Sequence, residues 1–408
     1  MISQIDLEAS SAWHVLSAFI IFILGVFGAL SLSKSFNCSS GRALLLYLWH
    51  TFFCLVHLVY VKMNHGDSIM YFNTLKFGWG HNMDKLPLYS IGTAFIRHLT
   101  QFLKLDLNLS FLGVFLVFNI FGFVGLLAFD ASLRKALLFS SQLDKYFATV
   151  LVFLPSISFW TASLNKDAIS FMAIGLMMWG ALEPSRRSLL MFFSIFLMLL
   201  VRPHMAGLMT VALIGAIIFG AGKMSFWRRT CIAALAVPLA AYAISIVLTR
   251  DFFMGEGVRY IFEAIEVRQG YMAEGAGTVD VSNMSFSMQV FTYLFRPLFF
   301  EAHNFSSLIA SIDNIIILVF FVFAFRNLWV KKFSGPLYLC LWLYAILSLW
   351  ILAVTTTNMG ISARQKWMCV PVLIFLFSAG AQRISIFRRN MRLERAFFCV
   401  TKKREEYD

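Results

Sequence analysis

The chain has 408 residues, of which 60% are hydrophobic and 13% are charged, and its mean hydropathy is +0.77. Soluble proteins carry about 25% charged residues, so this chain has about half the usual charge. The composition excludes a water-soluble enzyme, a disordered protein and a secreted disulfide scaffold. It favours an all-α polytopic membrane protein.

The formal net charge of +13 does not indicate a nucleic-acid partner, because Lys and Arg occur in short clusters between apolar segments. That distribution is typical of membrane topology, in which cytoplasmic loops collect basic residues. Six cysteines are scattered without CxxC spacing, so we expect neither a disulfide framework nor a metal site, and nothing indicates a cofactor. The start of the chain, with Asp6 and Glu8, has no basic region typical of a cleavable signal peptide.

Apolar segments predict about eleven transmembrane helices, since roughly 20 apolar residues cross the hydrocarbon core of a bilayer. Pro155 and Pro203 mark places where helices end or bend. In chain order the segments lie near 12–32, 43–61, 109–130, 146–161, 168–182, 188–201, 205–222, 230–248, 308–329, 336–354 and 367–382.

The distribution of basic residues predicts the orientation. If the N-terminus is outside and the spans alternate, Lys and Arg are about threefold denser in the inside segments than in the outside ones. The chain is therefore expected to be N-out and C-in, with residues 1–382 forming one transmembrane bundle and residues 383–408 a basic cytoplasmic tail.

Two of the outside connections are long. The first, near 62–108, ends in an apolar-rich stretch at 91–103 that predicts a helix on the membrane surface. The second, near 249–307, has a Gly-, Ser- and acid-rich middle between two aromatic parts. Because structureless loops of this length are uncommon, we expect short surface helices around a flexible hinge.

Ionisable residues at the mouth of a membrane bundle are costly, so each asks for a reason. Under the predicted orientation, five connections bring such residues to the outer side. They are Asp67; Lys166 with Asp167; Arg202 with His204; Arg296 with Glu301 and His303; and Arg364 with Lys366.

These residue types favour phosphate chemistry. The planar guanidinium of Arg can bind two phosphate oxygens at once. We therefore interpret five basic residues as a cationic pocket at the outer membrane boundary: Lys166, Arg202, Arg296, Arg364 and Lys366. Breaking a glycosyl phosphate bond needs charge stabilisation on the leaving group and a base for the acceptor. Candidates for that base are Asp67, Glu301 and His204.

Simpler structural interpretations of the same residues stay open. An isolated Arg at a helix end commonly extends to the membrane interface. Lys166 and Asp167 can form a local ion pair and a helix N-cap, and Asp67 can belong to a simple turn. Glu301 and His303 lack the spacing of a metal site.

Asp67 in a long outer loop, followed by Lys166-Asp167 in an outer turn, resembles the layout of GT-C membrane glycosyltransferases. Five strings, within residues 43–382, are similar to those of Wzy-type O-antigen and exopolysaccharide polymerases. The strings are Phe159 to Ser163, Lys166-Asp167, Arg202-Pro203-His204, Phe295-Arg296-Pro297 and Asn358 to Lys366. The resemblance implies a multi-pass protein of the bacterial inner membrane. It would take glycans from undecaprenyl diphosphate at the periplasmic face and join repeat units.

The resemblance also implies roles for particular residues. Asp67 would be the catalytic base, with His204 or Glu301 behind it, and its position after the second span implies one extra N-terminal helix. The other roles are interpretations of the residue types themselves. Arg202, Arg296 and Arg364 are expected to bind the lipid diphosphate, Lys166 and Asp167 to shape the donor pocket, and His303 and Lys366 to belong to the substrate site.

The implied partners are a lipid-linked glycan donor, a glycan acceptor, membrane lipids and envelope-polysaccharide assembly proteins. Three alternatives stay open. A GT-C transferase with a polyprenyl-monophosphate donor needs fewer cations than the five candidates. A lipid-linked oligosaccharide flippase is expected to show internal repeats and broken helices near the midplane, and the sequence shows no repeat. The third alternative is an assembly partner without enzymatic activity, which would not need a cluster of charged residues on the outer side of the bundle.

Overall fold

The computed structural model describes residues 11–64, 66–74, 91–138, 140–219, 284–302, 304–325 and 336–380, with a few single positions between 227 and 281. Its longer helices are α1 (Ala12–Ser35), α2 (Ser40–Asn64), α5 (Phe111–Ala136), α6 (Gln142–Val152), α8 (Lys166–Ala181), α9 (Pro184–Val201), α10 (Pro203–Phe219), α13 (Phe286–Phe295), α14 (Phe305–Phe325), α15 (Pro336–Thr355) and a final helix, Val370–Gly380.

Short helices connect the long ones. They are α3 (Asp67–Phe72), α4 (Thr93–Gln101), η2 (Phe102–Asp106), α7 (Pro155–Thr161), η3 (Phe299–Glu301), α16 (Met359–Gln365) and η4 (Lys366–Met368). Within the described ranges the one β feature is an isolated bridge between Thr278 and Asn358. The predicted all-α class is therefore confirmed for this part of the chain.

Six of the described helices are long and apolar enough to cross a membrane, which confirms the prediction of a membrane protein. They are α1, α2, α5, α9, α14 and Tyr338–Thr355 of α15. Three shorter apolar helices accompany them: α10, α13 and Val370–Gly380. The count of about eleven spans and the orientation stay predictions. Most of the predicted span near 230–248 and the tail 383–408 lie outside the described residues.

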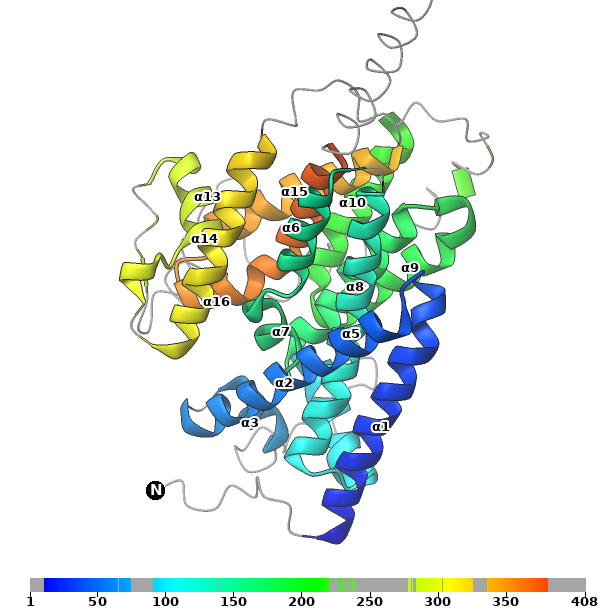
Figure 1. The fold of residues 1–408 in the computed structure, drawn as a ribbon, viewed down its shortest axis with the longest axis vertical. Helices are drawn as coiled ribbons and strands as arrows, with labels where there is room; N and C mark the ends of the chain where they lie inside the picture. Colours follow the sequence, from blue (N-terminus) through cyan, green and yellow to red (C-terminus); the bar gives the residue numbers. More distant parts are fainter. Residues whose placement is uncertain are drawn as a thin grey trace, which may run out of the picture.

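The bundle is arranged around α5 and α8. In Figure 1, α1 lies on one side, α13 and α14 lie on the other, and α5, α8 and α10 lie between them. The backbones of α5 and α8 approach closely at two glycines, because a Cβ atom built on Gly175 would lie 2.4 Å from the carbonyl oxygen of Gly125. Small residues permit such contact between membrane helices. This packing brings the start of α8 into the interior, where charged side chains gather.

The predicted span near 146–161 is two helices in the structure. The chain leaves the helical path after Val152 and begins α7 at Pro155, whose ring has no N–H and is favoured in the first turn of a helix. The backbone N–H of Ser156 donates to Asp313 Oδ2 of α14 at 2.6 Å. A carboxylate from a neighbouring helix thus caps the interrupted helix inside the bundle.

The two long predicted loops are only partly described. Helix α4 and the π-helical turn η2 occupy the stretch for which a surface helix is expected, and α3 precedes them. In the second loop, α13 and η3 are helical, while the aromatic first part near 252–271 and most of the polar middle lie outside the described residues.

Candidate functional site

Asp167 is the centre of a group of charged side chains. It lies in the first turn of α8, and Asn165 caps that helix by accepting a hydrogen bond from the backbone N–H of Asp167 at 2.7 Å. Because Asn165 provides the cap, the carboxylate of Asp167 is left for other partners. Its Oδ1 accepts a hydrogen bond from Arg202, and its Oδ2 lies 3.0 Å from Arg364 Nε as an ion pair without hydrogen-bond geometry.

Arg202 occupies the junction between α9 and α10. Its backbone is extended, with φ −145° and ψ 77°, and Pro203 begins the next helix at once. The side chain is only 6% exposed, so it does not extend to the membrane interface as an isolated Arg commonly does. Burial of this charge is compensated by Asp167, which is 4% exposed.

Arg364, in α16, joins Asp167 to Asp67. Its Nη1 donates a hydrogen bond to Asp67 Oδ2 at 2.9 Å. Asp67 is the first residue of α3, with Gly66 at the N-cap, so it begins a helix and is not part of a simple turn. Its side chain is 45% exposed. We call Asp67, Lys166, Asp167, Arg202 and Arg364 the Asp167 cluster.

The cluster changes the acid–base properties of its members. Burial, together with repulsion from Arg202, lowers the pKa of Lys166 to about 8. Burial opposes the charge of Arg364, but the carboxylates of Asp167 and Asp67 outweigh it and raise the pKa of that guanidinium. Burial and the charge of Asp67 raise the pKa of Tyr71, a residue of α3 in electrostatic contact with the cluster, to about 12.

The other sequence-derived candidates lie elsewhere. Arg296 forms a bidentate pair with Glu301, with its Nε 2.9 Å from Oε1 and 3.1 Å from Oε2. Lys366 donates to Asn314 of α14. His204 lies partly buried in the first turn of α10, two positions after Arg202, and His303 lies outside the described residues. The structure thus brings Arg202, Arg364 and Lys166 together, whereas Arg296 and Lys366 have other partners.

A second buried polar group was not among the sequence-derived candidates. Asp313 and Asn314 lie within the apolar helix α14 and are both fully buried. Asp313 binds Ser156, and Asn314 links Lys366 to the carbonyl oxygen of Pro297, to which its Nδ2 donates at 3.0 Å. Burial lowers the pKa of Lys366 to about 8. The signal for this group was an Asp-Asn pair inside an apolar segment, where ionisable residues are rare.

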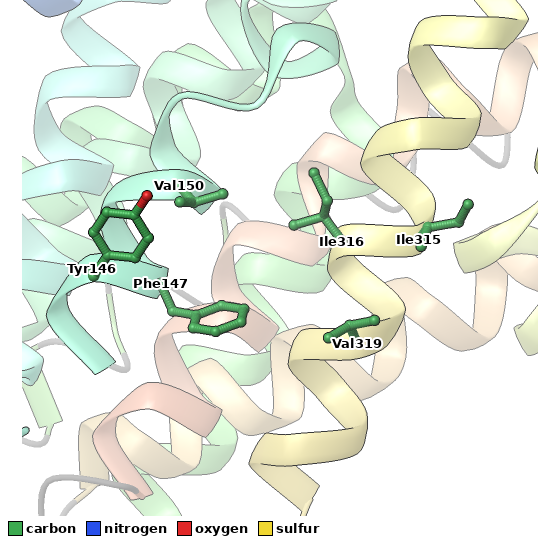
Figure 2. A pocket seen from close by; sticks show the side chains of 6 residues that line it. All are labelled: Tyr146, Phe147, Val150, Ile315, Ile316 and Val319. Atoms are coloured by element: carbon green, nitrogen blue, oxygen red, sulfur yellow. The ribbon is translucent and has the colours of Figure 1, made fainter. Parts of the chain in front are cut away.

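An apolar cavity of about 270 Å³ lies between α6 and α14. Figure 2 shows its lining side chains: Phe147 of α6 points toward α14, where Ile316 and Val319 lie, and Tyr146, Val150 and Ile315 complete the lining. Ile316 is one helical turn beyond Asp313 on α14. The cavity therefore begins one helical turn from the second polar group, and it is partly open, since Tyr146 and Ile315 are exposed.

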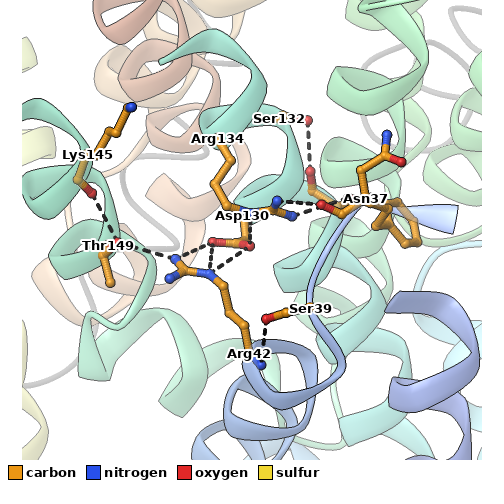
Figure 3. A network of polar contacts seen from close by, with 10 residues as sticks. Asn37, Ser39, Arg42, Asp130, Ser132, Arg134, Lys145 and Thr149 are labelled. Atoms are coloured by element: carbon orange, nitrogen blue, oxygen red, sulfur yellow. Dashed lines mark hydrogen bonds and ion pairs between the residues drawn. The ribbon is translucent and has the colours of Figure 1, made fainter. Parts of the chain in front are cut away.

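A different charged network lies at the opposite end of α2 from Asp67. Arg42 and Arg134 both bind Asp130, which is fully buried, with Arg42 Nε 3.1 Å from Oδ1 and Arg134 Nε 2.8 Å from Oδ2 (Figure 3). Arg134 also donates to the carbonyl oxygens of Phe36 and Asn37. These contacts fasten the α1–α2 connection to α5, and the network is explained by that structural role.

Across the described ranges, no group of three His, Cys, Asp or Glu side chains is arranged to hold a metal ion. Comparisons with protein-family models, with curated proteins and with solved structures give no match to this chain. The geometry of the Asp167 cluster therefore carries the functional argument. It offers guanidinium and ammonium groups for an anion and a half-exposed carboxylate for a proton.

Proposed function

We propose that this chain is a membrane glycosyltransferase that uses a lipid-linked sugar phosphate. Within that class we propose a Wzy-like polymerase of bacterial envelope polysaccharide. It would act on undecaprenyl-diphosphate-linked glycans at the periplasmic face of the inner membrane. The observation that carries the proposal is that Arg202 and Arg364 meet on Asp167, while Asp67 lies at the exposed end of the same cluster.

The charge balance of the cluster favours an anionic ligand. Among the described residues of the cluster, three cations, Lys166, Arg202 and Arg364, face two carboxylates, Asp67 and Asp167, which leaves one surplus positive charge in a mostly buried site. Unbalanced charge is costly within a membrane bundle and is commonly retained for function. Each guanidinium has five N–H donors, so Arg202, paired with one carboxylate, and Arg364, paired with two, both keep donors for phosphate oxygens.

The residues suit a group transfer to a sugar hydroxyl. The acceptor hydroxyl oxygen bonds to the anomeric carbon of the donor sugar while the bond from that carbon to the phosphate oxygen breaks. The acceptor proton moves to the carboxylate of Asp67, which Arg364 orients at 2.9 Å. The lipid phosphate leaves with the electron pair, and Arg202, Arg364 and Lys166 stabilise its charge.

The apolar cavity supports a lipid carrier. Asp313 lies about 12 Å along α14 from Phe305, at a rise of 1.5 Å per residue, and the cavity residues Ile316 and Val319 lie deeper. Lys366, which contacts α14 beside Asp313, follows Arg364 by two positions. A headgroup at the Asp167 cluster would therefore have an apolar space for its hydrocarbon chain further along α14.

The test is sugar transfer by the purified full chain in proteoliposomes with a lipid-linked glycan. Arg364→Ala and Asp67→Asn are expected to abolish polymer formation while the protein still inserts. Arg134→Ala, which alters an Arg–Asp pair at the other end of the bundle, is the matched control and should retain activity. Wild-type polymer length with both Arg364→Ala and Asp67→Asn would refute the proposal.

One observation favours a second candidate, a transporter of lipid-linked oligosaccharide. Transporters commonly have discontinuous helices with polar groups near the midplane, and the α6–α7 break capped by Asp313 has that form. A flippase would move a fluorescent lipid-linked oligosaccharide across proteoliposomes without lengthening it. Asp313→Asn would slow that movement, whereas Asp67→Asn would leave it unchanged.

A further inference from the structure

Besides the ion-paired atoms Asp167 Oδ2 and Arg364 Nε, two further buried polar atoms near the Asp167 cluster have no hydrogen-bond partner within the described structure. They are Nε of Arg202 and the hydroxyl of Tyr293, which lies in α13 and interacts electrostatically with Arg202 and Asp167. Arg202 is 6% exposed and Tyr293 is 2% exposed, so solvent does not compensate either atom. Buried polar groups are nearly always hydrogen-bonded in native proteins, and an exception asks for an explanation.

The two atoms belong to one electrostatic environment. Tyr293 interacts electrostatically with Cys369, Arg202, Tyr344 and Asp167. Nη2 of Arg202 is occupied by Asp167, whereas its Nε–H is left over. A guanidinium has only donors, and a phenol hydroxyl can donate. Both groups are therefore suited to the same kind of partner, an oxygen that accepts hydrogen bonds.

A neighbouring tyrosine offers a comparison. Tyr344 of α15 is also buried, at 3% exposed, and its hydroxyl donates to the carbonyl oxygen of Met368 at 3.1 Å. The hydroxyl of Tyr293, in contrast, is unpaired, as is Nε of Arg202. The surplus positive charge around Asp167 makes an anionic oxygen a better partner than a neutral one.

We propose that Arg202 Nε and the Tyr293 hydroxyl donate hydrogen bonds to the phosphoryl group of the ligand, with Asp167 holding Arg202 in position. This inference rests on the proposed function, because it assigns the phosphate of the transferred group to a defined place. Tyr293 is then a substrate-binding residue contributed by α13. Preorganised hydrogen-bond donors around a leaving phosphate stabilise the charge that develops on it, because they need not reorganise during the reaction.

The test measures anion binding by the purified full chain in detergent, separately from sugar transfer. The probes are inorganic pyrophosphate, geranyl phosphate and, as a neutral reference, geraniol. Binding is followed by calorimetry and by the change in melting temperature. Tyr293→Phe is compared with Tyr344→Phe, which removes a satisfied hydroxyl from the same region.

Wild-type protein is expected to bind a phosphate probe but not geraniol. Tyr293→Phe should weaken that binding about tenfold, which corresponds to ~1.4 kcal/mol, and should not lower the melting temperature of the unliganded protein. Tyr344→Phe should lower the melting temperature and keep the affinity. Tighter binding of geranyl phosphate than of pyrophosphate identifies a lipid headgroup, and the reverse identifies free phosphate.

The inference is overturned if wild-type protein binds neither phosphate probe, or if Tyr293→Phe binds both as tightly as wild type does. It is also overturned if Tyr293→Phe only lowers the melting temperature, since that is the result of a purely structural hydroxyl. Sugar transfer separates the two claims. If the protein transfers sugar but Tyr293→Phe binds phosphate as tightly as wild type does, this inference alone is refuted. If the protein binds phosphate through Tyr293 but transfers no sugar, the proposed function alone is refuted.

Discussion

Arg364 and Asp67 are 297 positions apart in the sequence, yet the guanidinium donates to the carboxylate at 2.9 Å. The same guanidinium lies 3.0 Å from Asp167, so one side chain of α16 connects the starts of α3 and α8. Long-range contacts of this kind make the Asp167 cluster sensitive to single substitutions, and several outcomes can be measured.

Asp67→Asn separates catalysis from folding. The amide keeps an oxygen that can accept from Arg364, and the Asp67 side chain is 45% exposed, so the loss of stability should be below about 1 kcal/mol. Sugar transfer should fall by at least about 100-fold, because general-base catalysis contributes a factor of that size. Thermal unfolding and sugar transfer are measured on the same preparation. Wild-type transfer by Asp67→Asn would show that another residue is the general base.

Asp167→Leu should strongly destabilise the protein. It leaves Arg202 buried without its carboxylate partner, and breaking a buried ion pair from one side costs about 3–5 kcal/mol. The double variant Asp167→Leu with Arg202→Met removes both charges and should recover part of that loss. Chemical unfolding in detergent gives the two values. Equal stability of the single and double variants would contradict the coupling.

Phosphate binding should weaken as the pH rises through about 8. The pKa of Lys166 is lowered to about 8, so its ammonium is charged below that pH and neutral above it. Arg202, Arg364, Asp167 and Asp67 act on this lysine electrostatically. The attraction that Lys166 offers an anion is therefore present on the acid side and lost on the alkaline side.

Lys166→Arg tests that assignment, because a guanidinium stays charged over the whole range. The variant should bind pyrophosphate with little change between pH 7 and pH 9 in calorimetry. Lys366 has a pKa lowered to the same region, so Lys366→Met serves as the control and should keep the wild-type pH profile. A flat profile in Lys366→Met would assign the pH dependence to that residue instead.

Filling the apolar cavity should discriminate between long and short lipid carriers. Ile316→Trp places a large ring between α6 and α14, and it is expected to reduce transfer from a long-chain polyprenyl donor while sparing a short-chain one. Ile312→Trp is the matched control, since that residue is on the same helix, 46% exposed and outside the cavity. Equal loss with both donors would indicate a packing defect and not a tail-binding site.

Local pattern was sufficient for much of the fold. Continuous apolar segments predicted α1, α2, α5, α9 and α14, because a helix that crosses hydrocarbon must satisfy its backbone internally with apolar side chains outside. The span near 146–161 was less predictable. Pro155 indicated a bend, but only the contact between Ser156 and Asp313 explains why the interruption is tolerated inside the bundle.

The candidate site was predicted in part for a similar reason. Charges at the mouths of apolar spans are conspicuous, so Asp67, Asp167, Arg202 and Arg364 were identifiable one at a time. The ion-pair partners of these residues were not identifiable, because tertiary packing determines which carboxylate lies within reach of a given Arg. Arg296 was grouped with them on residue type, yet it binds Glu301 only five positions away.

The sequence by itself determined that this is a helical membrane protein and which connections carry charge, since hydrophobicity and charge are properties of segments. Only the tertiary structure decided that Arg202 and Arg364 share Asp167, and that Tyr293, with an unpaired hydroxyl, interacts electrostatically with Arg202 and Asp167. Those relationships depend on how α8, α13 and α16 pack against one another, and helix packing is set by side-chain shape across distant parts of the chain.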